Sequence, residues 1–293
     1  MNLMEFKTIG LFGHMRSQDI RETISTVSAF LKNKGCRILL EASLAEALNE
    51  TSLEIANIEK LVSMIDLALV IGGDGALLST ARAMVHYNVP LLGINRGSLG
   101  FLTDIRPAEV EQKLEEILAG KFHRENRFLL EATLIDDLNR QQDHAVNEIV
   151  LSAQGAHHLI QYEIYIDKRF VCRQRADGLI IATPTGSTAY ALSGGGPIIH
   201  PELNALTLVP MFPHTLSMRP IVINGDSTIS LRVQKNINSQ IQIGCDSQTF
   251  LPVNENSHIE IKKKKENITL IHPESYNYYK SLRSKLGWGS KLI

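Results

Sequence analysis

Three glycines and one carboxylate stand together at Gly72-Gly73-Asp74-Gly75, directly after a buried-looking apolar run. Glycines let a backbone come close to phosphates, and the free N–H groups of a helix that begins there favour an anion. A carboxylate would repel a phosphate, so Asp74 indicates a different role, which is to accept a proton from an attacking hydroxyl, to hold a magnesium ion, or both. The alternative is a tight strand-to-helix turn that Asp74 caps. The spacing is neither that of a P-loop nor that of a dinucleotide-binding glycine turn.

A second polar loop, from Asn95 to Asp104, begins at the end of the next apolar run. In a doubly wound sheet, two adjacent strand ends face the same crevice. Asn95 and Arg96 could therefore contact phosphate, although Arg96 could equally pair with a surface acid. Phe101 could stack on a base or close the pocket.

The segment from Asp177 to Pro197 is rich in hydroxyls and glycines and follows a buried-looking strand. Thr185 and Thr188 offer hydroxyls at the start of a short helix, and Tyr190 offers an aromatic face. This combination predicts a site for a nucleotide with its base, ribose and phosphates.

Two adjacent polar residues, Asn147 and Glu148, interrupt the alternating run 145–151. One of the pair should point inward, and a buried acid must be paired or bound to ligand hydroxyls. A binding role and surface exposure both remain open for this pair.

These loops must be held at one edge of a β-sheet. The first third of the chain has the sequence pattern of a parallel sheet with connecting helices. Short apolar runs alternate with helix-period segments, which predicts parallel strands with right-handed crossovers in a Rossmann-like α/β domain over residues 1–122. Strands are expected at 9–12, 36–40, 65–71 and 89–94, and helices at 19–34, 44–49, 76–85 and 107–119.

After about residue 122 the period changes to two, as at 161–166, 228–233 and 258–261. Alternation predicts half-buried strands, and hence an antiparallel β-sandwich domain over residues 123–275. The basic run 262–265 is expected to be the solvated end of a hairpin that turns at Glu266-Asn267. Residues 278–286 return to helical spacing, so we expect a C-terminal helix within 276–293 that packs on the first domain.

Composition excludes several classes of protein. Thirty basic and 31 acidic residues give a net charge of −1, which removes the attraction that a nucleic-acid binder normally uses. No run approaches the roughly 20 apolar residues of a membrane span. The three cysteines are widely spaced and odd in number, so neither a disulfide framework nor a zinc site is indicated. A reducing cytoplasm is the expected compartment.

Taken together, four motifs resemble the bacterial NAD kinase family, most of all its Gram-negative type. They are Gly72-Gly-Asp-Gly75, Asn95-Arg-Gly-Ser-Leu-Gly-Phe-Leu-Thr-Asp104, Asn147-Glu148 and Asp177-Gly-Leu-Ile-Ile-Ala-Thr-Pro-Thr-Gly-Ser-Thr-Ala-Tyr190. The likeness runs nearly end to end. The family transfers a phosphoryl group from ATP to the 2′-hydroxyl of the adenosine ribose of NAD, so magnesium and ATP are expected.

The resemblance implies a role for each motif residue. Asp74 would be the catalytic carboxylate, and the glycine turn with Asn95 and Arg96 would meet phosphates. The NAD-binding set implied by the resemblance is Asp74, Gly75, Phe101, Asn147, Glu148, Arg175, Asp177, Thr185, Thr188, Ala189, Tyr190, Ser193 and Gln248. Asn147 and Thr185 would face the adenine, Glu148 the ribose, and Asp177 with Ala189 the nicotinamide side. Arg175 resembles the arrangement in members that prefer oxidised NAD.

The sequence departs from the family pattern at two positions. Ala76 stands where many members have Asn or Thr, and Ser247 stands where many read Gly. Two rival functions remain: a lipid kinase that shares the glycine turn, and a non-catalytic NAD(P)-sensing module. A homo-oligomer, dimer or tetramer, is expected from the resemblance, with the β domain as its interface.

Overall fold

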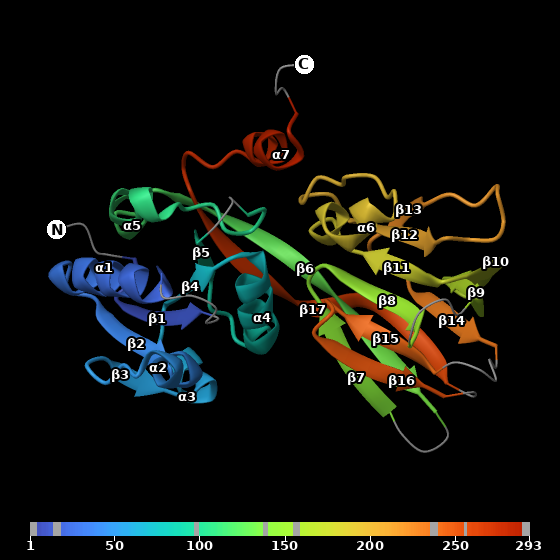
Figure 1. Cartoon of the computed structure of the whole chain (residues 1–293), viewed down its shortest axis with the longest axis horizontal. Coiled ribbons are helices and arrows are strands. Elements are labelled where there is room, and N and C mark those ends of the chain that lie inside the picture. Colours follow the sequence, from blue (N-terminus) through green and yellow to red (C-terminus); the bar gives the residue numbers. More distant parts are fainter. Residues whose placement is uncertain are drawn as a thin grey trace. The chain divides into compact units, whose positions relative to one another are not determined.

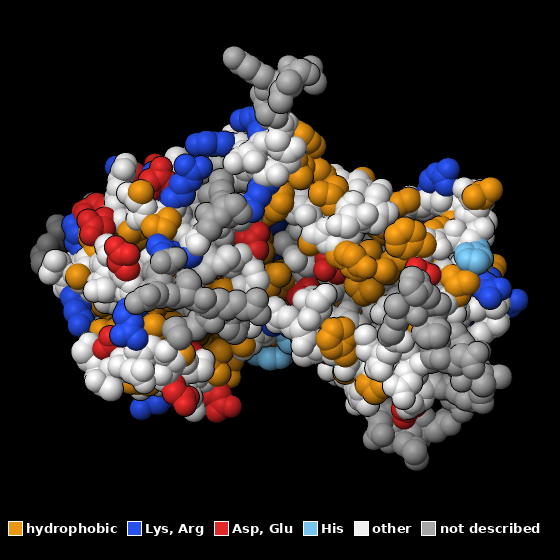
Figure 2. Space-filling view, in the orientation of Figure 1, with side chains coloured by type: hydrophobic (Ala, Val, Ile, Leu, Met, Phe, Trp, Pro, Cys, Tyr) orange, Lys and Arg blue, Asp and Glu red, His pale blue; other side chains and the backbone are white. Residues whose placement is uncertain are grey.

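The computed structural model describes residues 5–13, 19–96, 100–136, 140–154, 159–234, 240–254 and 257–288. Residues 97–99 of the second polar loop and residues 289–293 of the expected C-terminal helix region lie outside this set. The chain divides into two compact units (Figure 1). Unit 1 is Met1–Asn126 with Ile268–Ile293, and unit 2 is Arg127–Asn267. Basic and acidic side chains lie interspersed over the face of unit 1 that Figure 2 shows, in keeping with the near-zero net charge.

Unit 1 is an α/β domain built on a parallel sheet. Its strands lie in the order β5-β4-β1-β2-β3, and each neighbouring pair is parallel. The strands are β1 (Thr8–Gly13), β2 (Arg37–Glu41), β3 (Glu54–Ala56), β4 (Leu67–Gly72) and β5 (Leu91–Asn95). The helices are α1 (Asp19–Asn33), α2 (Ala42–Leu48), α3 (Ile58–Val62), α4 (Asp74–Met84), the 3-10 turn η1 (Pro107–Glu109), α5 (Val110–Leu118) and α7 (Tyr278–Leu286).

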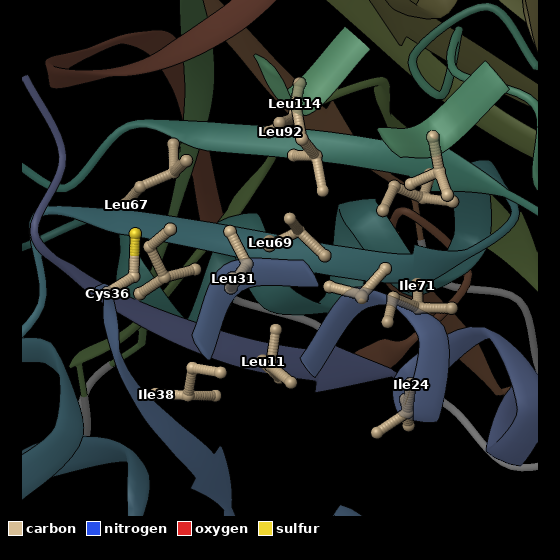
Figure 3. Packing of buried hydrophobic residues seen from close by; sticks show 14 of the residues in the cluster. Leu11, Ile24, Leu31, Cys36, Ile38, Leu67, Leu69, Ile71, Leu92 and Leu114 are labelled. Carbon is tan, nitrogen blue, oxygen red and sulfur yellow. The ribbon is translucent and has the colours of Figure 1, made fainter. Parts of the chain in front are cut away.

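The core of unit 1 explains why these strands form. β4 is buried along its whole length, as a parallel strand covered on both faces must be. Leu11, Leu69 and Ile71 point to one face and pack against Ile24 and Leu31 of α1 (Figure 3). Other side chains of the same cluster come from α2 and α5. The Rossmann-like α/β domain predicted from the sequence is confirmed.

Unit 2 consists of two antiparallel sheets. One has the order β13-β12-β11-β8-β15-β16, and the other contains β10-β9-β14 with the first half of β17. The first sheet comprises β8 (Glu148–Ala153), β11 (Gly178–Ala182), β12 (Ala205–Met211), β13 (Ile221–Asn224), β15 (Ile241–Cys245) and β16 (Thr249–Val253). The second comprises β9 (Ile160–Ile166), β10 (Arg169–Ala176) and β14 (Ile229–Val233), and β7 (Arg140–Ala145) pairs with β6.

One hydrophobic cluster joins the two sheets of unit 2 into a sandwich. Ile149, Leu179 and Ile243 from the first sheet share it with Tyr162 and Ile259 from the second. The predicted antiparallel second domain is confirmed. Two short helical elements, η2 (Gly186–Thr188) and α6 (Tyr190–Ser193), lie between β11 and β12.

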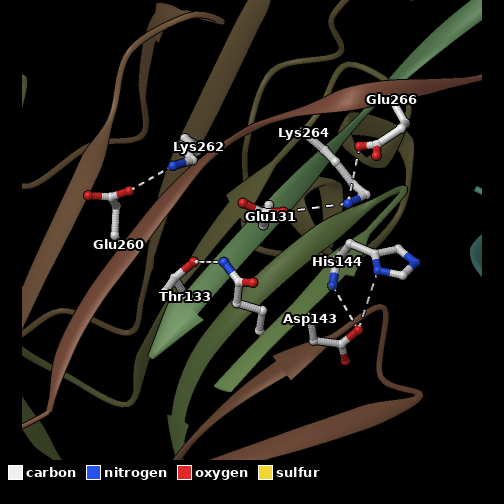
Figure 4. Close-up of polar contacts among 9 residues, drawn as sticks. Glu131, Thr133, Asp143, His144, Glu260, Lys262, Lys264 and Glu266 are labelled. Atoms are coloured by element: carbon white, nitrogen blue, oxygen red, sulfur yellow. Dashed lines mark hydrogen bonds and ion pairs between the residues drawn. The ribbon is translucent and has the colours of Figure 1, made fainter. Parts of the chain in front are cut away.

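Two long strands continue from one unit into the other, and they correct one prediction. β6 is Phe122–Ile135 and β17 is His258–Pro273. The basic run was expected at a hairpin end, but it lies inside β17, and the strand continues through Glu266-Asn267. The ladder tolerates these lysines because acidic partners lie beside them: Lys262 pairs with Glu260, and the buried Lys264 lies between Glu131 and Glu266 (Figure 4).

Candidate active site

The glycine turn joins β4 to α4 in unit 1. β4 ends at Gly72, Gly73 occupies the N-cap position of α4, and Asp74 begins the helix. Gly72 pairs with Asn95 at the end of β5, so the two polar loops predicted from the sequence do start at neighbouring strand ends. Gly73 and Gly75 are exposed, as a backbone that meets a ligand must be.

Four hydrogen bonds from the second loop orient the carboxylate of Asp74. The N–H of Phe101 donates to Oδ2 at 2.8 Å. Oδ1 accepts from the N–H of Leu102 at 3.1 Å and from the N–H and hydroxyl of Thr103 at 3.2 and 3.1 Å. Asp74 is therefore more than a helix cap, because its oxygens are held by a separate loop. Oδ2 keeps a lone pair for a further donor or cation.

Gly100 and Asn95 make this loop geometry possible. A Cβ at Gly100 would lie 1.9 Å from Asp74 Oδ1, so only glycine fits there. The buried Asn95 amide donates to the hydroxyl of Thr103 at 2.8 Å, and the Asn95 N–H donates to the carbonyl of Ile105. The Asn95 side chain thus supports the loop from within unit 1. Arg96 is half-buried at the same strand end.

Ala76 is buried and lies against the end of β4. A Cβ added at Gly72 would lie 2.7 Å from the Cβ of Ala76, so the close approach of α4 to β4 requires glycine at position 72.

In unit 2, one buried carboxylate organises the Asn147-Glu148 segment. Asp246 accepts hydrogen bonds from the N–H groups of Val146, Asn147 and Glu148 at 2.7, 2.8 and 3.1 Å. The Thr183 N–H donates to the Asn147 carbonyl at 2.9 Å. This segment is therefore fixed from two sides before any ligand arrives.

The side chains of Asn147 and Glu148 present acceptors that the described protein leaves unused. Asn147 Oδ1 and Glu148 Oε2 are buried, and neither has a hydrogen-bond partner in the described part of the chain. Glu148 is 5% exposed. Burial, and then the charge of Asp246, raise the pKa of Glu148 from 4.5 to about 8, while a hydrogen bond from the Tyr190 backbone lowers it. Glu148 therefore holds its proton at neutral pH and can both donate and accept.

Two hydroxyls of the loop after β11 form hydrogen bonds inside unit 2. Thr183 donates to the Val146 carbonyl, and Ser187 donates to the Pro184 carbonyl and accepts from the Ile199 N–H. Both are used inside the unit. Thr185 lies beside the buried Arg127, whose guanidinium donates to its hydroxyl at 3.1 Å.

Gly186 brings this loop against the Asn147 segment. A Cβ there would meet the Asn147 carbonyl oxygen at 2.1 Å. Thr188 and Ala189 are half-buried, and Tyr190 and Ser193 are exposed. Gln248 is exposed on the β15–β16 turn, two residues beyond Asp246. The strand register thus gathers these residues at one end of β8, β11 and β15.

Arg175 and Asp177 lie at the opposite end of β11 from this group. Gly178 pairs with Ser152, whereas Ala182 pairs with Glu148. Four residues of strand separate the two ends, which is about 14 Å at the usual rise. Within one chain, these two residues are not brought together with Asn147 and Thr185.

Sequence reasoning missed the residues that support the site. Asp246, Arg127 and Thr103 had no assigned role. Among the described residues, no group of three or more His, Cys, Asp or Glu side chains is placed to hold a metal ion. None of the described helices has the length and apolar character needed to cross a membrane.

Comparisons with known proteins show the family of the chain. The family model for the ATP-NAD kinase N-terminal domain matches residues 9–122, and that for the C-terminal domain matches residues 146–273. Curated proteins named NAD kinase from Pseudomonas putida F1 and Pseudomonas syringae pv. syringae B728a are each 47% identical over 293 residues, which covers 98% of this chain and 98% of each relative.

Two crystal structures share the fold. Yeast NADH kinase complexed with NADH has a TM-score of 0.88 at 23% identity, covering 99% of this chain and 90% of that one. An NAD kinase from Archaeoglobus fulgidus in complex with ATP has a TM-score of 0.67 at 23% identity, covering 96% and 97%. On the two family models and the 47% identical relatives, the chain belongs to the ATP-NAD kinase family and is an enzyme of that family.

Proposed function

We propose that this chain transfers the γ-phosphoryl group of ATP to the 2′-hydroxyl of the adenosine ribose of NAD, giving NADP and ADP. The acceptor site is supported mainly by two buried acceptors, Asn147 Oδ1 and Glu148 Oε2, which have no hydrogen-bond partner among the described residues. A buried acceptor without a donor is costly, so a ligand that supplies N–H and O–H groups binds there favourably. The adenine amino group suits Asn147, and the ribose hydroxyls suit Glu148.

Asp74 is the group that takes the proton. The 2′-oxygen attacks the γ-phosphorus as the bond from phosphorus to the bridging oxygen of ADP breaks, and the hydroxyl proton passes to the carboxylate. The hydrogen-bonding pattern favours Asp74 Oδ2 for this step, because Oδ1 already accepts three hydrogen bonds and Oδ2 one. Positioning supplies most of the acceleration in such a reaction, and a general base adds about 10²- to 10⁴-fold.

The phosphates are held by the exposed backbone of Gly73 and Gly75 at the start of α4, with Arg96 nearby. A single carboxylate fits magnesium chemistry, since Mg²⁺ in such sites is commonly held by one or two carboxylates and the substrate phosphates. Bound there, the ion would neutralise charge on the β- and γ-phosphates. Asp74 is the residue that would assist in holding it.

The remaining residues implied by the family resemblance bind the rest of the dinucleotide. Thr185, Thr188, Tyr190, Ser193 and Gln248 complete the adenosine end, and Asp177 serves the nicotinamide side. Arg175 favours oxidised NAD. Because Arg175 and Asp177 lie at the far end of β11, they act on a part of the ligand remote from the adenine.

The chain works as a homo-oligomer, a dimer or tetramer, in the cytoplasm. Large apolar side chains on unit 2 support an interface there: Phe170, Phe212 and Leu216 are 58%, 80% and 92% exposed. The three cysteines are free, which suits a reducing compartment.

Incubation of the purified chain with NAD, ATP and magnesium tests the function. We expect NADP, detected with an NADP-specific dehydrogenase, and no phosphorylation of a diglyceride. Asn147→Ala should raise the KM for NAD about tenfold, as expected for one lost hydrogen bond. Asn224→Ala is the control and should leave KM unchanged, because the Asn224 side chain accepts from the Asp226 N–H at an exposed turn of the same unit. Binding of NAD without any NADP would instead favour a sensing module.

A further inference from the structure

A buried histidine at the end of β17 lies between two carboxylates of unit 1. His272 Nδ1 is 3.0 Å from Asp104 Oδ2, and Nε2 is 3.0 Å from Glu125 Oε2. The ring stacks on Tyr276, with centroids 4.0 Å apart, and the side chain is 2% exposed. Nothing in the proposed chemistry of Asp74 or of the NAD site uses this cluster.

Both contacts favour a charged ring. A neutral imidazole has one donor and one acceptor nitrogen, so it would turn a lone pair toward one of the carboxylates. The imidazolium donates from Nδ1 to Asp104, while Nε2 meets Glu125 at ion-pair distance without hydrogen-bond geometry. Although burial lowers the pKa of His272, the hydrogen bonds to Asp104 and Glu125 raise it, and the net shift is upward. The groups that face the ring are Asp104 from the second polar loop, Glu125 from β6 and Tyr276 from the segment after β17.

This histidine is connected to the loop that orients Asp74. Asp104 directly follows Thr103, which supplies two of the four hydrogen bonds to Asp74. The other oxygen of Asp104, Oδ1, is buried without a partner in the described part of the chain. His272 therefore supplies the hydrogen bond that holds the Asp104 side chain.

The loop is thus anchored at Thr103 and at the two residues that follow it. Asn95 holds the Thr103 hydroxyl and the carbonyl of Ile105, and His272 holds Asp104, which lies between them in the sequence. A shift of about 1 Å in a reacting group can cost about a hundredfold in rate. The anchor at His272 is therefore in a place where it can affect turnover without touching a substrate.

We propose that His272 is a positioning residue: its ring, held between Asp104 and Glu125, fixes the loop whose N–H groups orient the Asp74 carboxylate. This inference rests on the proposed role of Asp74. It predicts a loss in kcat with little change in the KM for NAD, because the residues that bind adenosine belong to unit 2.

Two amide substitutions separate the two contacts of the ring. The amide nitrogen of Asn can take the place of the histidine Nδ1, and that of Gln can take the place of Nε2. His272→Asn thus keeps the hydrogen bond to Asp104, and His272→Gln keeps only a polar group beside Glu125. We expect His272→Gln to lower kcat about tenfold or more, and His272→Asn to lose less than about threefold. Asp104→Asn, which weakens the same link from the other side, should lower kcat in the same way and serves if the His272→Gln chain does not fold.

A control for stability and a double substitution complete the test. Cys36→Ala lies in the core of unit 1, away from the loop, and should lower the melting temperature while leaving kcat unchanged. In an Asp74→Asn background, His272→Gln should cause no further loss, because His272 acts through Asp74. Equal losses in the Asn and Gln variants, wild-type turnover in His272→Gln, or a further loss in the double variant would each overturn the inference. If Asp74→Asn alone has wild-type turnover, the proposed role of Asp74 fails instead.

Discussion

Replacing Glu148 by glutamine should stabilise the folded chain, and the gain should grow with pH. Glu148 is buried beside Asp246, and its pKa rises from 4.5 to about 8 on folding. Between these two values the folded chain holds a proton that the unfolded chain has released. Stability therefore falls as the pH rises from about 4.5 to about 8, and glutamine removes that dependence.

The size of the effect follows from the pKa change. One pKa unit corresponds to about 1.4 kcal/mol, so at pH 7 the raised pKa costs the folded state about 3 kcal/mol, and at pH 5 about 1 kcal/mol. Glutamine keeps the shape and the hydrogen-bonding capacity of the protonated acid. The residue that we assign to the ribose is thus a source of instability in the free protein, a trade-off that functional sites commonly show.

The free energy of unfolding, measured with urea at several pH values from 5 to 8, tests this prediction. The difference in unfolding free energy between Glu148→Gln and wild type should increase by about 3 kcal/mol over that range. Glu202→Gln, with a side chain that is 79% exposed in the same unit, is the control and should show no comparable increase. A difference that stays flat with pH, or that falls, would show that Glu148 does not hold its proton in the folded chain.

Three further predictions concern the supports of the NAD site. Gly186→Ala places a Cβ 2.1 Å from a carbonyl oxygen, so it should reduce NAD affinity at least tenfold by displacing Asn147, as isothermal titration would show. Asp246→Asn loses charge-assisted hydrogen bonds to the N–H groups of the 146–148 segment, so we expect a destabilisation of about 2 kcal/mol or more and a higher KM for NAD. Ser247 has φ +55°, a conformation that suits glycine, so Ser247→Gly should raise the melting temperature by a degree or more without changing kcat.

Local patterns predicted the elements that carry strong periodicity. The helix expected at 278–286 is α7, which begins at Tyr278 and ends at Leu286, and the glycine turn does join a buried strand to a helix. Residues 54–62 were missed because β3 has three residues and α3 has five, too few to show a period. The hairpin at Glu266-Asn267 was wrong because tertiary ion pairs let lysines continue a strand.

Contacts between distant segments could not be predicted from one sequence. Asp246 is about 100 residues from the backbone that it holds, and His272 is 168 residues from Asp104. Neither residue belongs to a local pattern that would indicate its partner. The sequence shows which motifs carry chemistry, but the supports that fix them depend on the folded chain.

The turnover of Asp74→Asn shows whether the Asp74 carboxylate takes the proton from the ribose hydroxyl. The variant should fold with an unchanged circular dichroism spectrum and still bind NAD, because Asn147 and Glu148 are untouched. Its kcat for NADP formation should fall by about 10²- to 10⁴-fold, the usual contribution of a general base. Turnover near that of the wild type would show that another group takes the proton, and the account of this site would fail.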